Sequence, residues 1–242
     1  MRTVAVVLAA GTGSRFGAGP AKQLRLLGGR TLLERSVAAF TQARGIDQVL
    51  VVTAADLAAE VRALLTGSPK LAAVIEGGKA RSDSTRQAIA WLTTSMGPGD
   101  SGDETKVLFH DAARPLVDPR IITDCVDALD RWDAVGVVVP TTDTIVELAD
   151  GAFCRILPRD SLARCQTPQG FRLGVIRRAH ELAAADPGFA ALPATDDCGV
   201  VLRYLPEVRV GAVTGSERNL KITYASDLAV AETLIDPGTA PG

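Results

Sequence analysis

The stretch most suited to chemistry lies near the N-terminus, where glycines and cations occur together. Residues 8–23 read LAAGTGSRFGAGPAKQ and contain four glycines, together with Arg15 and Lys22. Small residues let the backbone turn tightly and bring its N–H groups against a ligand. The two cations add fixed positive charge, so the stretch predicts a binding loop for a polyphosphate.

Two common glycine loops fit this stretch poorly. The dinucleotide fingerprint needs G-x-G-x-x-G, whereas Gly11, Gly13 and Gly17 have one residue too many between them. The second predicted strand also lacks a suitable acid at its end, which argues against an NAD-dependent oxidoreductase. The P-loop needs Gly-Lys-Ser/Thr, which is absent. An ordinary strand-to-helix turn, or a non-catalytic nucleotide-binding protein, would not need both cations at these offsets.

A second glycine-rich segment, GGKARSDS at residues 77–84, follows another predicted strand. Its backbone groups and short hydroxyls could read the edge of a pyrimidine base. The alternative is that Ser82 or Asp83 only caps the helix that follows. Both interpretations hold together if one of these two residues caps the helix and Ser84 faces the ligand.

The segment HDAARP at residues 110–115 places a carboxylate at the end of a further strand. Asp111 is suited to hold a substrate hydroxyl or a Mg²⁺ ion, and Mg²⁺ is the expected cofactor. Arg114 could orient Asp111 or bind phosphate. His110 lies among apolar neighbours, so we expect a packed histidine rather than a catalytic base.

Three polar residues in the second half of the chain are candidates for binding an anion. Arg159 and Thr167 flank a segment that returns to the body of the protein, and both could meet a phosphate there. Arg159 could equally form an ion pair near Asp160. Lys221 stands between Leu220 and Ile222, so it belongs either to a solvated face or to an inward-facing anion site.

Short apolar runs alternate with segments of helical periodicity. Strands are predicted at residues 4–8, 48–53, 71–75, 106–110, 135–139 and 208–213, and helices at residues 31–43, 56–65, 82–94, 118–131, 173–185, 195–204 and 225–234. The pattern predicts an α/β fold with a Rossmann-like, mostly parallel sheet and helices on both faces. A ligand would bind at the carboxyl ends of the strands, where the two glycine-rich segments share an edge.

Residues 140–165 break this alternation. Asp150-Gly151, between two β-rich segments, is a strong signal for a two-residue hairpin. An antiparallel β-arm should therefore project from the sheet, and since such arms often join two copies, we expect a homodimer. The rest of the chain predicts a single domain over residues 1–236 and a flexible tail at residues 237–242.

Composition restricts the class of partner. The chain has 242 residues, and 47% of them are hydrophobic, which is enough for one sizeable core. A net charge of −2 argues against nucleic acid or an anionic membrane as the main partner. The four cysteines lack C-x-x-C spacing, so neither a disulfide framework nor a zinc site is expected. No segment predicts a membrane span or a leader, and we expect a cytoplasmic protein.

The order of several motifs resembles that of the CTP-dependent cytidylyltransferases acting on 2-C-methylerythritol 4-phosphate or ribitol 5-phosphate. These motifs are LAAGTGSRFG, AKQ, GGKARSDS, HDAARP, DTI, QTPQGF, TDDCG and NLKIT, and they extend over about residues 4–234. The resemblance implies a fold of the nucleotide-diphospho-sugar transferase type. It also implies an enzyme, a nucleotidyltransferase that transfers CMP from CTP to a polyol phosphate and releases pyrophosphate.

The resemblance further implies roles for individual residues. The nucleotide would be held by the two glycine-rich segments, at Leu8, Ala9, Ala10, Gly11, Gly13, Gly78 and Ser84. Three cations would contact the triphosphate and the transition state, namely Arg15, Lys22 and Lys221. The polyol phosphate would be bound by Asp111, Arg114, Thr144, Arg159, Thr167 and Thr195. Because the family exchanges the arm across a homodimer, Arg159 would serve the partner's site.

Four longer segments resemble the ribitol 5-phosphate enzymes more closely, which favours CDP-ribitol, for teichoic acids or capsules, as the product. They are GGKARSDST, AVGVVVPTTDTIVEL, TDDCGVVLRYLP and VGAVTGSERNLKIT. The alternative acceptor is 2-C-methylerythritol 4-phosphate, in isoprenoid synthesis. With either acceptor, the phosphate is close to a dianion and can attack the α-phosphorus of CTP without a general base. Charge repulsion is the obstacle, which Arg15, Lys22, Lys221 and Mg²⁺ would reduce.

Overall fold

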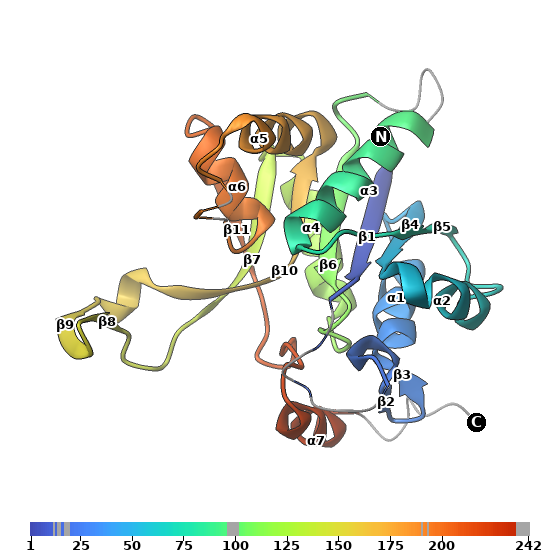
Figure 1. Ribbon diagram of the computed structural model, residues 1–242, viewed down its shortest axis with the longest axis horizontal. Helices are drawn as coiled ribbons and strands as arrows, with labels where there is room; N and C mark the ends of the chain where they lie inside the picture. Colours follow the sequence, from blue (N-terminus) through green and yellow to red (C-terminus); the bar gives the residue numbers. More distant parts are fainter. Residues whose placement is uncertain are drawn as a thin grey trace.

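The computed structural model describes residues 1–11, 13, 16, 20–95, 102–189, 191–192 and 194–235. Its centre is a seven-stranded sheet in the order β11-β7-β10-β6-β1-β4-β5 (Figure 1). The strands are β1 (Thr3–Ala9), β4 (Gln48–Thr53), β5 (Leu71–Glu76), β6 (Lys106–Asp111), β7 (Ala134–Pro140), β10 (Ala163–Arg172) and β11 (Val210–Thr214). Each of the six strands predicted from apolar runs is found here, with ends displaced by at most two residues.

Strand β10 was not predicted, and it runs antiparallel to both of its neighbours, β6 and β7. The other pairings of the sheet are parallel, so the expected mostly parallel sheet is confirmed. The sequence of β10, ARCQTPQGFR, holds polar residues, a proline and a glycine that weaken any strand signal. Its ladder with β7 is interrupted between Gln166 and Gln169, where both glutamine side chains are buried.

Helices cover both faces of the sheet. Helices α1 (Leu32–Gln42), α2 (Ala58–Leu64) and α4 (Pro119–Ala128) share one apolar cluster, whereas α3 (Arg81–Ser95), α5 (Leu173–Ala185) and α6 (Asp197–Tyr204) share another. Side chains of β1 alternate between the two clusters: Ala5 and Val7 face the first, and Val4 and Val6 face the second. A strand buried on both faces explains why β1 reads as a continuous apolar run.

Polar residues set the starts of several helices. Thr31 and Glu34 form a capping box at α1, in which Thr31 Oγ1 accepts from the backbone N–H of Glu34 at 3.1 Å. Asp118 caps α4 and precedes Pro119, the first helical residue. Helix α6 begins at Asp197 rather than at residue 195, because Asp196 is its N-cap and accepts from the backbone N–H of Gly199 at 2.8 Å.

A smaller layer lies against the sheet at its lower end in Figure 1. It contains β2 (Leu26–Leu27), β3 (Arg30–Thr31) and α7 (Ala225–Thr233), whose apolar side chains form a third cluster. Short 3-10 turns complete the elements, at Lys22–Leu24, Ala55–Leu57 and Arg159–Ser161. No helix of the described ranges is long and apolar enough to cross a membrane.

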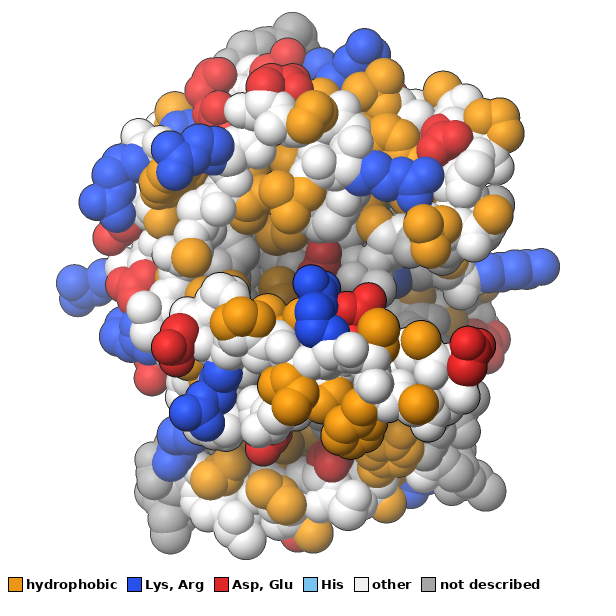
Figure 2. Space-filling model, turned by 90° about the vertical axis from the view of Figure 1, so that its left-hand side faces the viewer, with side chains coloured by type: hydrophobic (Ala, Val, Ile, Leu, Met, Phe, Trp, Pro, Cys, Tyr) orange, Lys and Arg blue, Asp and Glu red, His pale blue; other side chains and the backbone are white. Residues whose placement is uncertain are grey.

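The predicted hairpin projects from the body as an arm of β8 (Val146–Ala149) and β9 (Ala152–Ile156) (Figure 1). Its turn residues Asp150 and Gly151 have φ values of 51° and 80°, the left-handed values that a type I′ turn requires. Phe153 is 75% exposed and Ile156 is 64% exposed. Figure 2 faces this arm and shows hydrophobic side chains gathered near the middle of the view.

The predicted tail at residues 237–242 lies outside the described residues. The same holds for Arg15 in the N-terminal loop. The predictions made for these positions therefore stay predictions.

Candidate functional site

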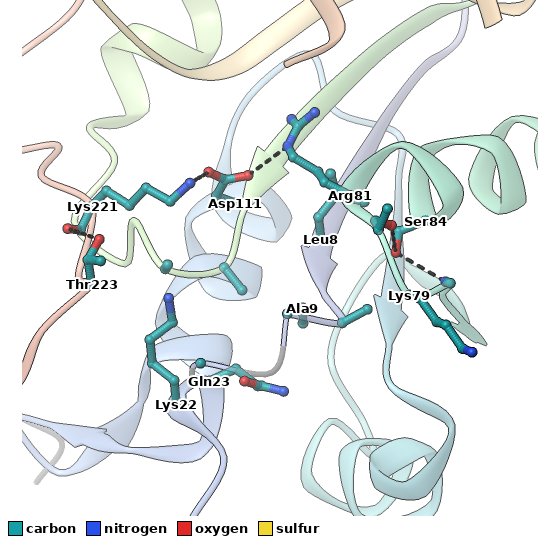
Figure 3. Close-up of a pocket in the computed structure, with 17 residues that line it drawn as sticks. Leu8, Ala9, Lys22, Gln23, Lys79, Arg81, Ser84, Asp111, Lys221 and Thr223 are labelled. Carbon is teal, nitrogen blue, oxygen red and sulfur yellow. Dashed lines mark hydrogen bonds and ion pairs between the residues drawn. The ribbon is translucent and has the colours of Figure 1, made fainter. Parts of the chain in front are cut away.

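A pocket of about 270 Å³ opens at the carboxyl ends of β1 and β6 (Figure 3). It is lined by Leu8, Ala9, Ala10, Gly11, Gly13, Lys22, Gln23, Gly78, Lys79, Ala80, Arg81, Ser84, Asp111, Ala112, Ala113, Lys221 and Thr223. All seven residues predicted to hold the nucleotide are among them. The two glycine-rich segments thus meet at one edge of the sheet, as the alternation of strands and helices predicted.

Gly13 and Lys22 come close together on one side of the pocket. Gly13 has a φ of +64°, and a Cβ added there would lie 2.8 Å from Cβ of Lys22. Only glycine fits this position without strain, because the backbone is left-handed and a side chain would collide with the lysine. The loop therefore needs glycine here in order to bring Lys22 against the pocket.

The segment after β5 is held in a tight turn by the start of α3. Oγ of Ser84 accepts from the backbone N–H of Gly78 at 3.3 Å, and Oδ2 of Asp83 accepts from that of Ala80 at 3.0 Å. A Cβ added to Gly78 would lie 2.1 Å from Cβ of Asp83. Asp83 therefore supports the helix start, while Ser84 lines the pocket and holds the glycine turn. That this segment reads a pyrimidine base stays a prediction.

Asp111 lies between two cations at the end of β6. Its Oδ2 is 2.7 Å from Nζ of Lys221, and its Oδ1 is 3.4 Å from Nε of Arg81. Burial disfavours the charged carboxylate, but the charges of Arg81, Lys221 and Arg114 outweigh burial and hold the pKa of Asp111 well below its usual range. Figure 3 shows Lys22 and Lys221 extending into the space beside Asp111, so two cations and one carboxylate face the same volume.

A chain of hydrogen bonds under the pocket supports Asp111. The backbone N–H of Asp111 donates to Oγ1 of Thr167 at 3.1 Å, and Oγ1 lies 3.0 Å from Nδ1 of His110. Nε2 of His110 lies 3.0 Å from the carbonyl oxygen of Arg114. These contacts assign the proton of His110 to Nε2, since that nitrogen faces an acceptor. Burial lowers the pKa of His110 to about 4, which confirms a packed, neutral histidine.

Arg114 is buried and faces backbone rather than the pocket. Its Nη1 donates to the carbonyl oxygen of Asn219 at 2.7 Å, and its Nη2 donates to that of Cys165 at 3.4 Å. Asn219 in turn donates through Nδ2 to the carbonyl oxygen of Thr167 at 2.8 Å. Arg114 thus ties together the segment that carries Lys221 and strand β10, whereas its predicted role in binding phosphate stays a prediction.

Three predicted acceptor-binding residues lie away from the pocket of this chain. Thr144 and Arg159 belong to the projecting arm, where both are exposed and Nη1 of Arg159 donates to the carbonyl oxygen of Thr142 at 3.3 Å. Thr195 is exposed just before the cap of α6. The arrangement of this chain alone therefore does not bring these side chains to Asp111.

Sequence reasoning missed Arg81, Asp197 and His180. Arg81 contacts Asp111 and also Asp197, where Nη1 and Oδ2 are 2.6 Å apart. Oδ1 of Asp197 lies 3.2 Å from Nε2 of His180. Arg81 belongs to the GGKARSDS motif, so its position three residues before Ser84 was a usable signal that it lies at the pocket. The local sequence does not indicate its partners Asp111 and Asp197, which are distant in sequence.

A resident metal site is not evident among these side chains. Within the described ranges, no group of three or more His, Cys, Asp or Glu residues could hold a metal ion. Both oxygens of Asp111, the candidate magnesium ligand, already face cations. The residues present do not form a protein-only Mg²⁺ cage.

Comparison with known proteins gives consistent matches. The sequence model of 2-C-methyl-D-erythritol 4-phosphate cytidylyltransferase (IspD) matches residues 3–236. A Thermobifida fusca (strain YX) protein with that enzyme name is 50% identical over 246 residues, covering 99% of this chain and 95% of the relative. A Haemophilus influenzae protein, bifunctional ribulose 5-phosphate reductase/CDP-ribitol pyrophosphorylase Bcs1, is 36% identical over 237 residues, covering 96% of this chain and 48% of the relative.

Solved structures have the same fold. The structure of 2-C-methyl-D-erythritol 4-phosphate cytidylyltransferase from Thermus thermophilus is 30% identical with a TM-score of 0.71, covering 97% of this chain and 98% of the other. The 4-diphosphocytidyl-2C-methyl-D-erythritol synthase of Anaerococcus prevotii gives a TM-score of 0.81 at 23% identity, covering 96% of this chain and 95% of the other. The second match shows the fold alone.

Proposed function

Because this chain belongs to the 2-C-methyl-D-erythritol 4-phosphate cytidylyltransferase family, we propose that it transfers CMP from CTP to 2-C-methyl-D-erythritol 4-phosphate. The coarser activity follows from the family: the chain is a nucleotidyltransferase, a CTP-dependent cytidylyltransferase. The observation that carries the choice of acceptor is the 50% identity, over 99% of the chain, to a relative with this enzyme name. The product would be the cytidine diphosphate derivative used in isoprenoid synthesis.

The preference for ribitol 5-phosphate that we drew from four segments is not supported. The relative named for CDP-ribitol is 36% identical, whereas the Thermobifida fusca relative is 50% identical and several others named for methylerythritol are 40–41% identical. Two of the four segments, GGKARSDST and VGAVTGSERNLKIT, contribute residues that line the pocket, and TDDCGVVLRYLP contains Asp197, which contacts Arg81. The residues of these segments at the pocket would serve the reaction that both groups share, so they do not separate the two acceptors. Ribitol 5-phosphate is the second candidate because of the 36% match.

The proposed reaction is an in-line displacement at phosphorus. A phosphate oxygen of the acceptor forms a bond to the α-phosphorus of CTP, and the bond from that phosphorus to the bridging oxygen of pyrophosphate breaks. The electron pair leaves with pyrophosphate, and no proton has to be removed from a phosphate that is already ionised. The site needs to hold two anions close together and neutralise them, which suits its lysines better than it suits a general base.

The pocket supports a division of tasks between its two sides. The glycine-rich segments would hold the nucleotide through backbone groups and Ser84, which is 3% exposed. Lys22 and Lys221, with Arg15 from the N-terminal loop, would neutralise the triphosphate and the charge that develops at phosphorus. Asp111 accepts hydrogen bonds only and would bind a hydroxyl of the polyol. Thr167 supports Asp111 from below, because its Oγ1 accepts from the backbone N–H of Asp111 at 3.1 Å.

Magnesium fits this site as part of the nucleotide substrate. Mg²⁺ is usually bound through one or two carboxylates together with substrate phosphates, and it keeps several waters. Since the described side chains include only Asp111 as a carboxylate lining the pocket, and cations face both of its oxygens, Mg²⁺ would arrive with the phosphates of CTP. When bound, it would supply further neutralisation of the triphosphate.

We also propose that a second copy of the chain completes the acceptor site. Thr144 and Arg159 belong to the arm, which projects from the rest of the chain (Figure 1). The apolar side chains of the arm at Leu148, Phe153 and Ile156 are 60–75% exposed. Burying such side chains against another copy would stabilise a dimer. In that arrangement, the arm of one chain would bring Arg159 to the acceptor phosphate in the pocket of the other.

Pyrophosphate release tests the proposal. Purified protein with Mg²⁺ and CTP is given either 2-C-methyl-D-erythritol 4-phosphate or ribitol 5-phosphate, and initial rates are measured with a coupled assay. We expect kcat/KM to be higher with the methylerythritol acceptor. A higher value with ribitol 5-phosphate would support the second candidate, and release with neither acceptor would contradict both.

A further inference from the structure

Arg81 connects two carboxylates that come from distant parts of the fold. It begins α3, while Asp111 ends β6 and Asp197 begins α6. Its Nε is 3.4 Å from Oδ1 of Asp111, and its Nη1 is 2.6 Å from Oδ2 of Asp197. The planar guanidinium therefore joins the glycine-rich segment before α3 to the strand end that carries Asp111.

Asp197, which pairs with Nη1 of Arg81, is buried and held by further contacts. Asp197 is 1% exposed, and its second oxygen lies 3.2 Å from Nε2 of His180, itself 3% exposed. The backbone N–H of Asp197 donates to Oε1 of Gln169, a residue of β10, at 3.1 Å. Asp197 is thus fixed by α5 and by the sheet at the same time, and it gives Arg81 a rigid anchor.

The other cation on Asp111 is less constrained. Lys221 contacts Oδ2 at 2.7 Å, but its side chain is 42% exposed, against 26% for Arg81. A lysine is a point charge on a flexible stem, whereas an arginine held at both ends loses little freedom on binding. Lys221 can therefore move from the carboxylate to a phosphate, and Arg81 cannot do so without breaking its contact with Asp197.

We propose that Arg81 is a positioning residue, which keeps Asp111 ionised and aimed at the acceptor when Lys221 transfers to the phosphates, and that Asp197 holds Arg81 in place for this task. The proposal rests on the proposed function, in which Asp111 binds the acceptor. It predicts that Arg81 acts on the acceptor through Asp111 and contributes little to the binding of CTP.

The test compares variants in two assays. Initial rates give KM for the acceptor, and calorimetry gives the Kd of CTP. Arg81→Gln should raise the acceptor KM about 10-fold or more, which corresponds to the loss of a hydrogen bond to a charged group, and should leave the Kd of CTP within about 2-fold. Arg81→Lys keeps the positive charge, but a single ammonium group cannot reproduce the contacts of the guanidinium with both Asp111 and Asp197. The acceptor KM of this variant should therefore lie between those of Arg81→Gln and the unaltered protein.

A double variant tests the part played by Asp197. Asp197→Asn should also raise the acceptor KM, and Arg81→Gln combined with Asp197→Asn should be no worse than Arg81→Gln alone, because both changes remove the same contact. Arg178→Gln is the control: Arg178 lies on α5, pairs with Glu181 of the same helix, and has a side chain that is 61% exposed. It should leave both constants unchanged.

The outcomes separate the proposal from the function on which it rests. If the unaltered protein transfers CMP but the acceptor KM of Arg81→Gln and Arg81→Lys is unchanged, Arg81 is not a positioning residue. A Kd of CTP that weakens as much as the acceptor KM would place Arg81 on the nucleotide and also overturn the proposal. If the unaltered protein transfers CMP to neither acceptor, the proposed function fails, and the role of Arg81 fails with it.

Discussion

Lys221 and Asp111 form an ion pair at the centre of the pocket, with Nζ 2.7 Å from Oδ2. The lysine follows a segment tied to Arg114 through Asn219, and the carboxylate ends β6. The pair therefore joins the C-terminal part of the chain to the central sheet at the place where both substrates are expected. Its two members have different expected partners, since the cation suits the phosphates and the carboxylate suits a hydroxyl.

Removal of Lys22 or Lys221 should lower kcat more than it weakens the binding of the substrates. Lys22→Ala or Lys221→Ala is expected to lower kcat at least ~100-fold, the scale of losing one donor to the transition state. Arg15→Ala carries the same prediction. Single-turnover rates at saturating CTP and acceptor measure the effect directly. Near-normal turnover in any of these variants would remove that residue from the mechanism.

The arm can be tested by mixing two inactive or weakened variants. Arg159→Ala should raise KM for the acceptor and spare CTP, because the lost charge would face the acceptor phosphate. If the arm is exchanged, each site combines the pocket of one chain with the arm of the other. A mixed dimer then contains one intact site, made of the pocket of the Arg159→Ala chain and the arm of the Lys22→Ala chain. Equal mixing, with exchange of subunits, should then restore about a quarter of the normal activity.

The control for mixing is each variant incubated with itself under the same conditions. No recovery in the mixture, although the subunits have exchanged, would mean that Arg159 serves its own chain. An unchanged acceptor KM in Arg159→Ala alone would remove Arg159 from the site.

Gly78→Ala should damage the nucleotide side of the pocket. The added Cβ would lie 2.1 Å from Cβ of Asp83, in a turn that has no flexible side-chain end to yield. Overpacking of this kind costs about 1–3 kcal/mol, and we expect the Kd of CTP to rise about 10-fold. Gly102→Ala is the matched control, since its nearest neighbour would be 3.8 Å away. Equal affinity for CTP in both variants would contradict the role of the 77–84 turn.

The stability of the protein should fall between pH 7 and pH 5 because of His110. Burial lowers the pKa of His110 to about 4, whereas an imidazole in the unfolded chain has a pKa of about 6.5. Between these values the unfolded state binds more protons, so stability is full above about pH 6.5 and declines as the pH falls toward about 4. The expected loss at pH 5 is about 2 kcal/mol.

Urea unfolding at pH 7 and pH 5 measures this difference, and His110→Gln should reduce it. The lowered pKa values of Asp111 and Asp197 contribute stability that is present above the unfolded carboxyl pKa of about 3.9 and lost below it, so they do not enter this range. An equal pH dependence in His110→Gln would show that another group is responsible.

Local sequence patterns were sufficient for most of the fold and for half of the pocket. The strands that are buried on both faces read as apolar runs, and the glycine segments follow two of them directly, so their meeting at one edge could be predicted. Strand β10 could not be predicted, because its polar residues, proline and glycine weaken the strand signal. Only the folded structure shows that Gln166 and Gln169 are buried and bonded to other segments.

The contacts of Arg81 show where sequence reasoning ends. Arg81 and Asp197 are separated by 116 positions, and the ion pair between them depends on how α3 and α6 pack beside the end of β6. The preference for ribitol 5-phosphate is the other prediction that the comparisons do not support. Motifs identify residues that the reaction requires, whereas discrimination between two polyol phosphates depends on pocket shape and on hydroxyl contacts that no single motif encodes.

A competition between the two acceptors decides whether the proposed activity is correct. The protein is given limiting CTP with equal concentrations of 2-C-methyl-D-erythritol 4-phosphate and ribitol 5-phosphate, and the two cytidine diphosphate products are separated by mass. Their ratio at early times equals the ratio of kcat/KM for the two acceptors. We predict that the methylerythritol product predominates at least ~10-fold, the scale of one well-placed polar contact. Predominance of CDP-ribitol, or formation of neither product, would contradict the proposed function.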